Sequence, residues 1–422
     1  MIAQALMNKP FEKRDDNYQP MLNMALARIR QLSAHEVGHT IGFAHNFAAS
    51  ANNRASVMDY PHPKLTLKNG AVDFSDAYAV GIGDWDKVTV AYSYSEFEEN
   101  ANEKNELNKV LEVATLAGHR FITDSDARAA GGAHALAHLW DNGGNATDEL
   151  KNVLEVRKTA IKDFSVDNIK SYEPYSVLED VFVPLYFYHR YQTEAATKII
   201  GGLDYNYAVK DGADFTVKPI DAKTQKTTLD IILKTLSADY LAIPKDKLNL
   251  FAPRAFGYGR SRESFSSKTG VAFDPFSAAN TASDMTLKFL LHPQRANRLV
   301  VQKSLDKNQL GLENMINAII ENSFKTNRSD SYLTEIQHQI NTNVLKYLMN
   351  LAVNDQSYFQ VKAIANKAIG NIAKQNLGFD TIKMQYGLMI KEFYEHPEKF
   401  KLKSAPKIPD GSPIGMGVCE FD

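Results

Sequence analysis

The most informative stretch of this sequence is HEVGHTIGFAH, residues 35–45. Its three histidines, His35, His39 and His45, are separated by four and then by six positions. Residues four apart on an α-helix project from the same face, so His35 and His39 can share one metal ion with bonds of about 2.0–2.1 Å. A third ligand six residues later cannot come from the same helix. Gly42, which has no Cβ and tolerates a positive φ, can end the helix and turn His45 back toward the other two.

This spacing indicates a catalytic metal site. Three neutral histidines fill three of the four positions of tetrahedral zinc and leave the fourth for water. Glu36 follows the first histidine directly, where it can take a proton from that water and later pass it to a leaving amine. We therefore expect Zn²⁺ as the cofactor. The alternatives are a helix with ordinary surface or core histidines, and a structural zinc site, which would leave Glu36 unexplained.

A second element, SVMDY, follows at residues 56–60. With the first motif it resembles the metzincin clan of zinc endopeptidases, which combine an elongated HExxHxxGxxH motif with a later methionine in a tight turn. The resemblance implies that the three histidines of the motif are zinc ligands and that Glu36 is the general base. It also implies that Met58 forms an apolar floor beneath the metal and that Tyr60 stabilises the tetrahedral oxyanion. For Tyr60, an ordinary buried tyrosine is the alternative.

Three longer segments indicate a particular family within this clan: ARIRQLSAHEVGHTIGFAHNFAAS (27–50), RASVMDYPHP (54–63) and DAYAVGIGDWDK (76–87). They are similar to the bacterial zinc-dependent metalloproteases of the Met-zincin or EcxA-type family, and weaker similarity extends over nearly the whole chain. Members are typically large exported proteins, which implies a periplasmic or secreted full-length parent. In metzincins, the sequence upstream of the motif supplies a substrate-binding sheet. Because the residues before His35 have a helical pattern, we expect the N-terminal part of the catalytic domain to be missing from this chain.

The composition excludes several other classes of protein. The 422 residues carry 48 basic and 50 acidic side chains, a net charge of −2, which gives no sign of a nucleic-acid partner. No apolar run approaches the ~20 residues of a membrane-spanning segment. We do not expect the first residues to be a signal peptide, because positive charge follows the apolar run instead of preceding it. Cys419 is the only cysteine, which excludes a disulfide framework and leaves an inhibitory zinc thiolate or a plain tail residue. The sequence does not indicate an oligomeric state.

The periodicity predicts a mainly α fold with short β hairpins. A long amphipathic helix is expected over 18–43, and another helix begins near Asp84. Hairpins are expected about Asn69-Gly70 and Asp211-Gly212, and an ordered loop over 251–282. Further helices are expected over 146–164, 174–200, 225–241, 283–291, 294–305, 308–324, 331–352, 356–376 and 379–397.

We expect the chain to be organised in three parts. Residues 1–98 would form the zinc-binding lower part of a metzincin-like catalytic domain. Residues 99–400 would form a large α-helical C-terminal domain. Residues 401–422, which include three prolines, would form an extended tail.

Other residues could also carry chemistry. His134 and His138 are four apart but lack the glutamate and a third ligand, so a second metal is weighed against ordinary packing. Asp124 and Asp126 could help to bind calcium, although the rest of a calcium loop is absent. The aromatic and polar stretch 186–191 could face the zinc cleft or form a buried network between helices.

The sequence as a whole favours a zinc-dependent endopeptidase that hydrolyses peptide bonds through a zinc-activated water, with Glu36 as general base. Its partner would be a protein or peptide substrate. The alternative is a non-catalytic zinc-containing binding module, or an inactive fragment of a longer protease.

Overall fold

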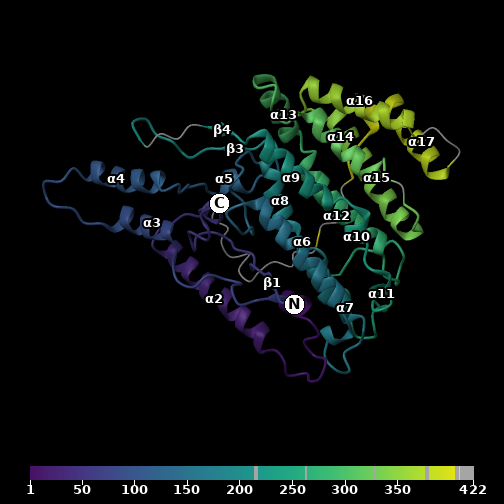
Figure 1. The fold of residues 1–422 in the computed structure, drawn as a ribbon, viewed down its shortest axis with the longest axis horizontal. Helices are drawn as coiled ribbons and strands as arrows, with labels where there is room; N and C mark the ends of the chain where they lie inside the picture. The colour runs from purple at the N-terminus through teal and green to yellow at the C-terminus, as the bar shows by residue number, and fades with distance from the viewer. Residues whose placement is uncertain (213–216, 262–263, 327, 376–379, 404–407, 409–422) are drawn as a thin grey trace.

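Helices dominate the computed structural model, which describes residues 1–422 except 213–216, 262–263, 327, 376–379, 404–407 and 409–422. The strands among the described residues form two antiparallel two-stranded ribbons (Figure 1). The predicted mainly α fold with short β hairpins is therefore confirmed. Within the same residues, no helix is both long and apolar enough to cross a membrane.

The order of helices and strands begins with the short helix α1, which the motif helix α2 follows. The α-helices are α1 (Ile2–Leu6), α2 (Gln19–Thr40), α3 (Asp84–Tyr94), α4 (Glu103–Leu116), α5 (Asp124–Ala127), α6 (Ala146–Asp163), α7 (Val177–Tyr186), α8 (Arg190–Ile199), α9 (Ala222–Lys234), α10 (Ala238–Leu241), α11 (Lys245–Leu248), α12 (Pro275–Leu290), α13 (Pro293–Leu305), α14 (Leu312–Ser323), α15 (Ser331–Val353), α16 (Phe359–Gln375) and α17 (Thr381–Glu395). The 3₁₀ helices are η1 (Ala49–Asn52), η2 (Val166–Asn168) and η3 (Pro397–Lys399), and the strands are β1 (Thr66–Lys68), β2 (Ala71–Asp73), β3 (Leu203–Asp204) and β4 (Lys218–Pro219).

The ribbon of β1 and β2 turns where the sequence predicted it. Lys68 pairs with Ala71, and the two residues between them, Asn69 and Gly70, have φ angles of 53° and 78°. Two positive φ angles are the requirement of a tight hairpin turn, which asparagine and glycine meet at low cost. The second predicted hairpin is present as the β3–β4 pairing, although residues 213–216 of its loop lie outside the described part of the chain.

The main hydrophobic core joins the first residues of the chain to its last helices. It includes Leu6 of α1, Leu178 of α7, Ile340 of α15 and Phe393 of α17. Figure 1 shows α12 and α14–α17 grouped together, whereas α3 and α4 project from the body as a pair. Since α1 packs against α7, the N-terminal segment shares a core with the helical part. The division of the chain at residue 98 stays a prediction.

The motif helix α2 is turned so that three of its polar side chains lie inside. Arg28, Gln31 and His35 are buried, and Arg28 donates a hydrogen bond to Gln31. The large apolar side chains that lie exposed on this helix are Leu22, Leu26, Ile29 and Val37. An amphipathic helix ordinarily buries its apolar side. The position of α2 is therefore set in large part by polar contacts to the interior, beside the apolar packing of Met24 in the main core.

Some segments differ from the expectation drawn from sequence. Helix α4 lies outside the expected helices, and the expected helix over 174–200 is divided into α7 and α8, with Pro184 inside α7. Helix α12 begins at Pro275, within the range expected to be a loop, because the Asp274 carboxylate caps it by accepting a hydrogen bond from the Ser277 amide (2.9 Å). Most of the predicted tail, and Cys419, lie outside the described residues.

The orientation of α2 predicts that its apolar side chains contribute little to stability. Ile29 is 44% exposed, whereas Ile340 in the main core is 0% exposed. We expect Ile29→Ala to change the free energy of unfolding by about 0.5 kcal/mol or less, and Ile340→Ala to lower it by about 2–5 kcal/mol. Urea unfolding followed by circular dichroism compares the two variants. Equal losses would contradict the exposed position of Ile29.

Candidate metal centre

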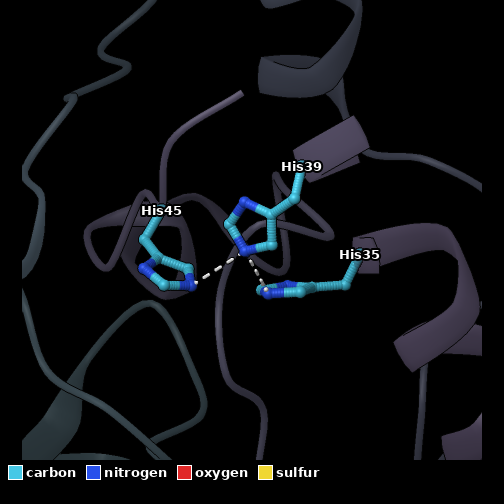
Figure 2. Close-up of side chains that lie close together, drawn as sticks. All are labelled: His35, His39 and His45. Carbon is cyan, nitrogen blue, oxygen red and sulfur yellow. Dashed lines mark hydrogen bonds between the residues drawn. The ribbon is translucent and has the colours of Figure 1, made fainter. Parts of the chain in front are cut away.

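The three histidines of the motif converge on one point. The Nε2 atom of His39 lies 3.0 Å from that of His35 and 3.1 Å from that of His45 (Figure 2). Their ligand atoms form the one group of three or more potential metal ligands found among the described residues. His35 and His39 come from consecutive turns of α2, and the chain then turns at Gly42, whose φ is 91°. The predicted turn at Gly42 is thus present.

Each ring is fixed by a hydrogen bond from its other nitrogen. His35 Nδ1 lies 2.7 Å from the carbonyl oxygen of Val57, and His39 Nδ1 lies 2.9 Å from that of Phe43. His45 Nδ1 lies 2.9 Å from a carboxylate oxygen of Asp124. These oxygens only accept hydrogen bonds, so each Nδ1 carries the proton and donates it. Each Nε2 then presents a lone pair to the centre of the cluster.

This arrangement fits a zinc ion. Lone pairs at such short separations repel one another unless a cation lies between them. Around tetrahedral zinc, nitrogens at about 2.0–2.1 Å from the metal are about 3.3–3.4 Å apart, close to the separations observed here. Burial lowers the pKa of His35 to about 4 and also lowers the pKa of His45. Both rings are therefore neutral near pH 7, as metal ligation requires.

Asp124 holds the ring of His45, a contact that the sequence did not reveal. It lies 79 positions from His45 along the chain, and sequence analysis considered it only as a possible calcium ligand. Partial burial raises the pKa of Asp124, but hydrogen bonds from His45 and Arg128 outweigh burial, and its pKa lies below the ordinary value. Asp124 is therefore ionised near neutral pH. A carboxylate that orients a ligating histidine also makes it a stronger ligand.

Met58 lies directly against the motif helix. A Cβ at Gly38 would come within 2.2 Å of the Met58 sulfur, so the absence of a side chain at Gly38 makes room for it. Met58 is buried and packs with Phe43 and Val57. Its carbonyl accepts a hydrogen bond from the amide of Asn46 (3.1 Å), which follows the third histidine.

Asp86 holds the segment around Met58 in place, and sequence analysis missed it. Its carboxylate accepts hydrogen bonds from the Ser56 hydroxyl (2.6 Å) and from the amides of Val57 (2.9 Å) and Gly83 (2.7 Å). In the sequence, Asp86 is recognisable only as an acidic residue in the first turn of α3, and such a residue ordinarily indicates only a helix cap.

Tyr60 is buried beside the histidines. Its ring centroid lies 4.9 Å from that of His45 and 5.3 Å from that of His35. It also stacks on Trp140 at 4.9 Å, and the Arg128 guanidinium lies 5.7 Å from its centroid. Glu36 is half-buried, and its negative charge acts on His35. The structure thus brings every residue predicted for the site into one region.

The other candidates do not join this cluster. His134 lies 2.8 Å from the Tyr205 carbonyl through Nε2, and its Nδ1 accepts the Leu136 amide (3.1 Å), so both nitrogens have protein partners. His138 is buried, with Glu194 at 3.6 Å. In the stretch 186–191, Tyr186 and Tyr188 donate hydrogen bonds to backbone carbonyls in the interior. These contacts agree with the second alternative for this stretch, a buried network between helices.

These features are those of a metzincin-type metalloprotease domain. They are a zinc-binding motif on a helix, a third histidine after a glycine turn, and a buried methionine that packs against the motif helix. The chain belongs to the Met-zincin family, whose model matches residues 17–330. No curated protein and no solved structure gives a significant match to this chain.

The bond between His45 and Asp124 predicts how strongly the cluster binds zinc. We expect Asp124→Ala to weaken zinc binding about 10–100-fold, because His45 loses the acceptor that fixes its ring and tautomer. Competition with a chromophoric chelator measures the affinity. Asp16→Ala is the matched control, since the Asp16 side chain is 76% exposed. An unchanged affinity in Asp124→Ala would contradict the assigned role.

Proposed function

We propose that this chain is a zinc-dependent endopeptidase in which His35, His39 and His45 hold the metal. The observation that carries the proposal is the convergence of three Nε2 lone pairs, each fixed by a hydrogen bond at Nδ1. Family membership supports the same function. The family resemblance further supports a periplasmic or secreted location for the full-length protein, which fractionation of cells that express it would test.

Zinc bound by the three histidines would polarise the carbonyl of a peptide bond and lower the pKa of water toward ~7. Glu36 then acts as general base. It accepts a proton from the attacking water as the oxygen–carbon bond forms, and it delivers this proton to the amide nitrogen as the carbon–nitrogen bond breaks. Its place next to His35 and its partial exposure support this role.

Tyr60 and Met58 would complete the site. A tyrosine hydroxyl that donates a hydrogen bond to the developing oxyanion lowers the barrier to attack. The short distance from Tyr60 to His45 and the neighbouring positive charge of Arg128 support this role. Met58, pressed against Gly38, would supply the apolar floor of the site.

The general-base role predicts that Glu36→Gln retains zinc and loses hydrolysis. We expect kcat/KM for a quenched peptide library to fall by about 10²–10⁴-fold, with an unchanged zinc content by elemental analysis. Glu12→Gln, at an exposed position, should keep full activity. A Glu36→Gln variant as active as the parent would refute the mechanism. A parent that binds zinc but cleaves no peptide would favour the binding-module alternative.

The oxyanion role predicts a loss in kcat for Tyr60→Phe. We expect kcat to fall by about 10²–10³-fold with little change in KM, because the lost hydrogen bond forms only in the transition state. The phenyl ring keeps the packing on Trp140, so the thermal midpoint should hold. Tyr94→Phe, whose hydroxyl donates to the Ile41 carbonyl, is the control. An unchanged kcat in Tyr60→Phe would make Tyr60 a packing residue only.

A further inference from the structure

A second polar site lies behind the segment that carries Met58. It is a small pocket with a volume of about 50 Å³, and its lining includes Ser50, Asp59, Asp141 and Asn142. We call it the acidic pocket. The three histidines are not part of its lining. Asp59 and Asp141 are each only 6% exposed, which is unusual for carboxylates without an ion-pair partner.

The hydrogen bonds of the acidic pocket leave one carboxylate oxygen unsatisfied. Asp59 Oδ1 accepts the Tyr60 amide at 2.7 Å, and Asp141 Oδ2 accepts the Ser50 hydroxyl at 2.9 Å. The other carboxylate oxygen of Asp141 is buried and has no hydrogen-bond partner among the described residues. A buried carboxylate oxygen without a partner is costly unless a ligand or solvent satisfies it.

The two carboxyls of the acidic pocket are costly to ionise in the absence of a compensating positive charge. Burial raises the pKa of Asp59 well above its ordinary value, and the neighbouring Asp141 raises it further. Burial also raises the pKa of Asp141 to about 7, against the opposing effects of Ser50 and Lys198, while Glu149 acts in the same direction as burial. Both groups therefore resist ionisation as long as no positive charge compensates them.

Two cationic side chains near the acidic pocket have hydrogen-bond partners elsewhere, although the charge of Lys198 acts on Asp141. Lys198 donates hydrogen bonds to the carbonyls of Ala127 and Ala137. Arg54, at the edge of the acidic pocket, is paired with Asp76 at 2.9 Å. Neither of these cations forms an ion pair with Asp59 or Asp141 among the described residues.

We propose that Asp59 and Asp141 bind a hard divalent cation, Ca²⁺, in the acidic pocket. Two carboxylates balance its charge, and the Ser50 hydroxyl adds an oxygen beside them. Ca²⁺ takes six to eight oxygen ligands, and carboxylates, carbonyls and water are its usual donors. The pocket supplies no nitrogen or sulfur ligand of the kind that zinc prefers, so the two metals would occupy separate sites.

The cation would tie together the segments that support the histidine cluster. Ser50 follows His45 by five positions, and Asp59 immediately precedes Tyr60. Asp141 follows Trp140, whose ring stacks on Tyr60 and whose amide donates to the Tyr60 carbonyl (2.8 Å). Calcium would therefore hold Tyr60 in position and stabilise the folded chain.

Terbium luminescence tests the proposal in the full chain, because Tb³⁺ replaces Ca²⁺ in oxygen sites and is excited through a nearby indole such as Trp140. We expect saturable luminescence that Ca²⁺ displaces, and a rise in the thermal midpoint with added CaCl₂. Asp141→Asn and Asp59→Asn should each abolish the saturable signal. Asp355→Asn, in an exposed turn, should leave it intact, and the double variant His35→Ala, His39→Ala should retain it. This last result separates the site from zinc binding and from protease activity.

The opposite results would overturn the proposal. One such result is that the parent shows no saturable Tb³⁺ binding. The other is that binding survives in both Asp59→Asn and Asp141→Asn, while circular dichroism shows that these variants fold. The two carboxyls would then share a proton. In that case stability falls as the pH rises from about 4 to about 7, because the folded chain keeps a proton that the unfolded chain releases. Asp141→Asn would reduce this pH dependence, and the part caused by the burial of Asp59 would remain.

Discussion

The structure of the site depends on three nitrogen lone pairs directed at one another. Each histidine donates its Nδ1 proton to a different part of the chain: the Val57 carbonyl, the Phe43 carbonyl and the Asp124 carboxylate. With these protons committed, the three Nε2 atoms cannot relieve their mutual repulsion by hydrogen bonding to one another. A cation placed between the three Nε2 atoms would remove this repulsion. Such preorganisation is what distinguishes a metal site from a chance grouping of histidines.

The segment 56–60 connects the histidine cluster to the rest of the molecule. The Val57 carbonyl accepts hydrogen bonds from both His35 and Gln31 of α2, and the Val57 amide donates to Asp86 of α3. Polar contacts therefore hold the segment from both sides. They also explain the orientation of α2, because Gln31 and His35 can reach Val57 only if their side of the helix faces inward. Hydrogen bonds of this kind specify a position more sharply than apolar packing does.

Sequence reasoning succeeded where the signal is local. The spacing of His35, His39 and His45, the Asn69-Gly70 turn and the start of a helix at Asp84 are each determined by residues within a few positions of one another. The helix over 18–43 was predicted for the same reason. Which side of that helix is buried is not a local property, because Gln31 and His35 find their common partner, Val57, more than 20 positions away.

The contacts that complete the site are long-range, and a single sequence carries no signal for them. Asp124 meets His45 across 79 positions, and Ser50 meets Asp141 across 91. Either aspartate, taken alone, is an ordinary acidic residue in a loop or a short helix. Only the folded chain shows that Asp124 orients a ligand and that Asp141 is buried without a full set of partners.

The packing around the histidines is separate from the main core, and this has a consequence for stability. Phe47, Tyr60 and Trp140 belong to a small hydrophobic cluster of their own, whereas the long helices share the large one. A small cluster buries little apolar area, so it gains less free energy from packing than the large core does. Its order must come in larger part from hydrogen bonds, and the proposed cations would add to it. We therefore expect the metal centre to lose its geometry more easily than α12, α15 and α16 lose theirs, and occupancy of the two proposed cation sites would decide whether the site is ordered.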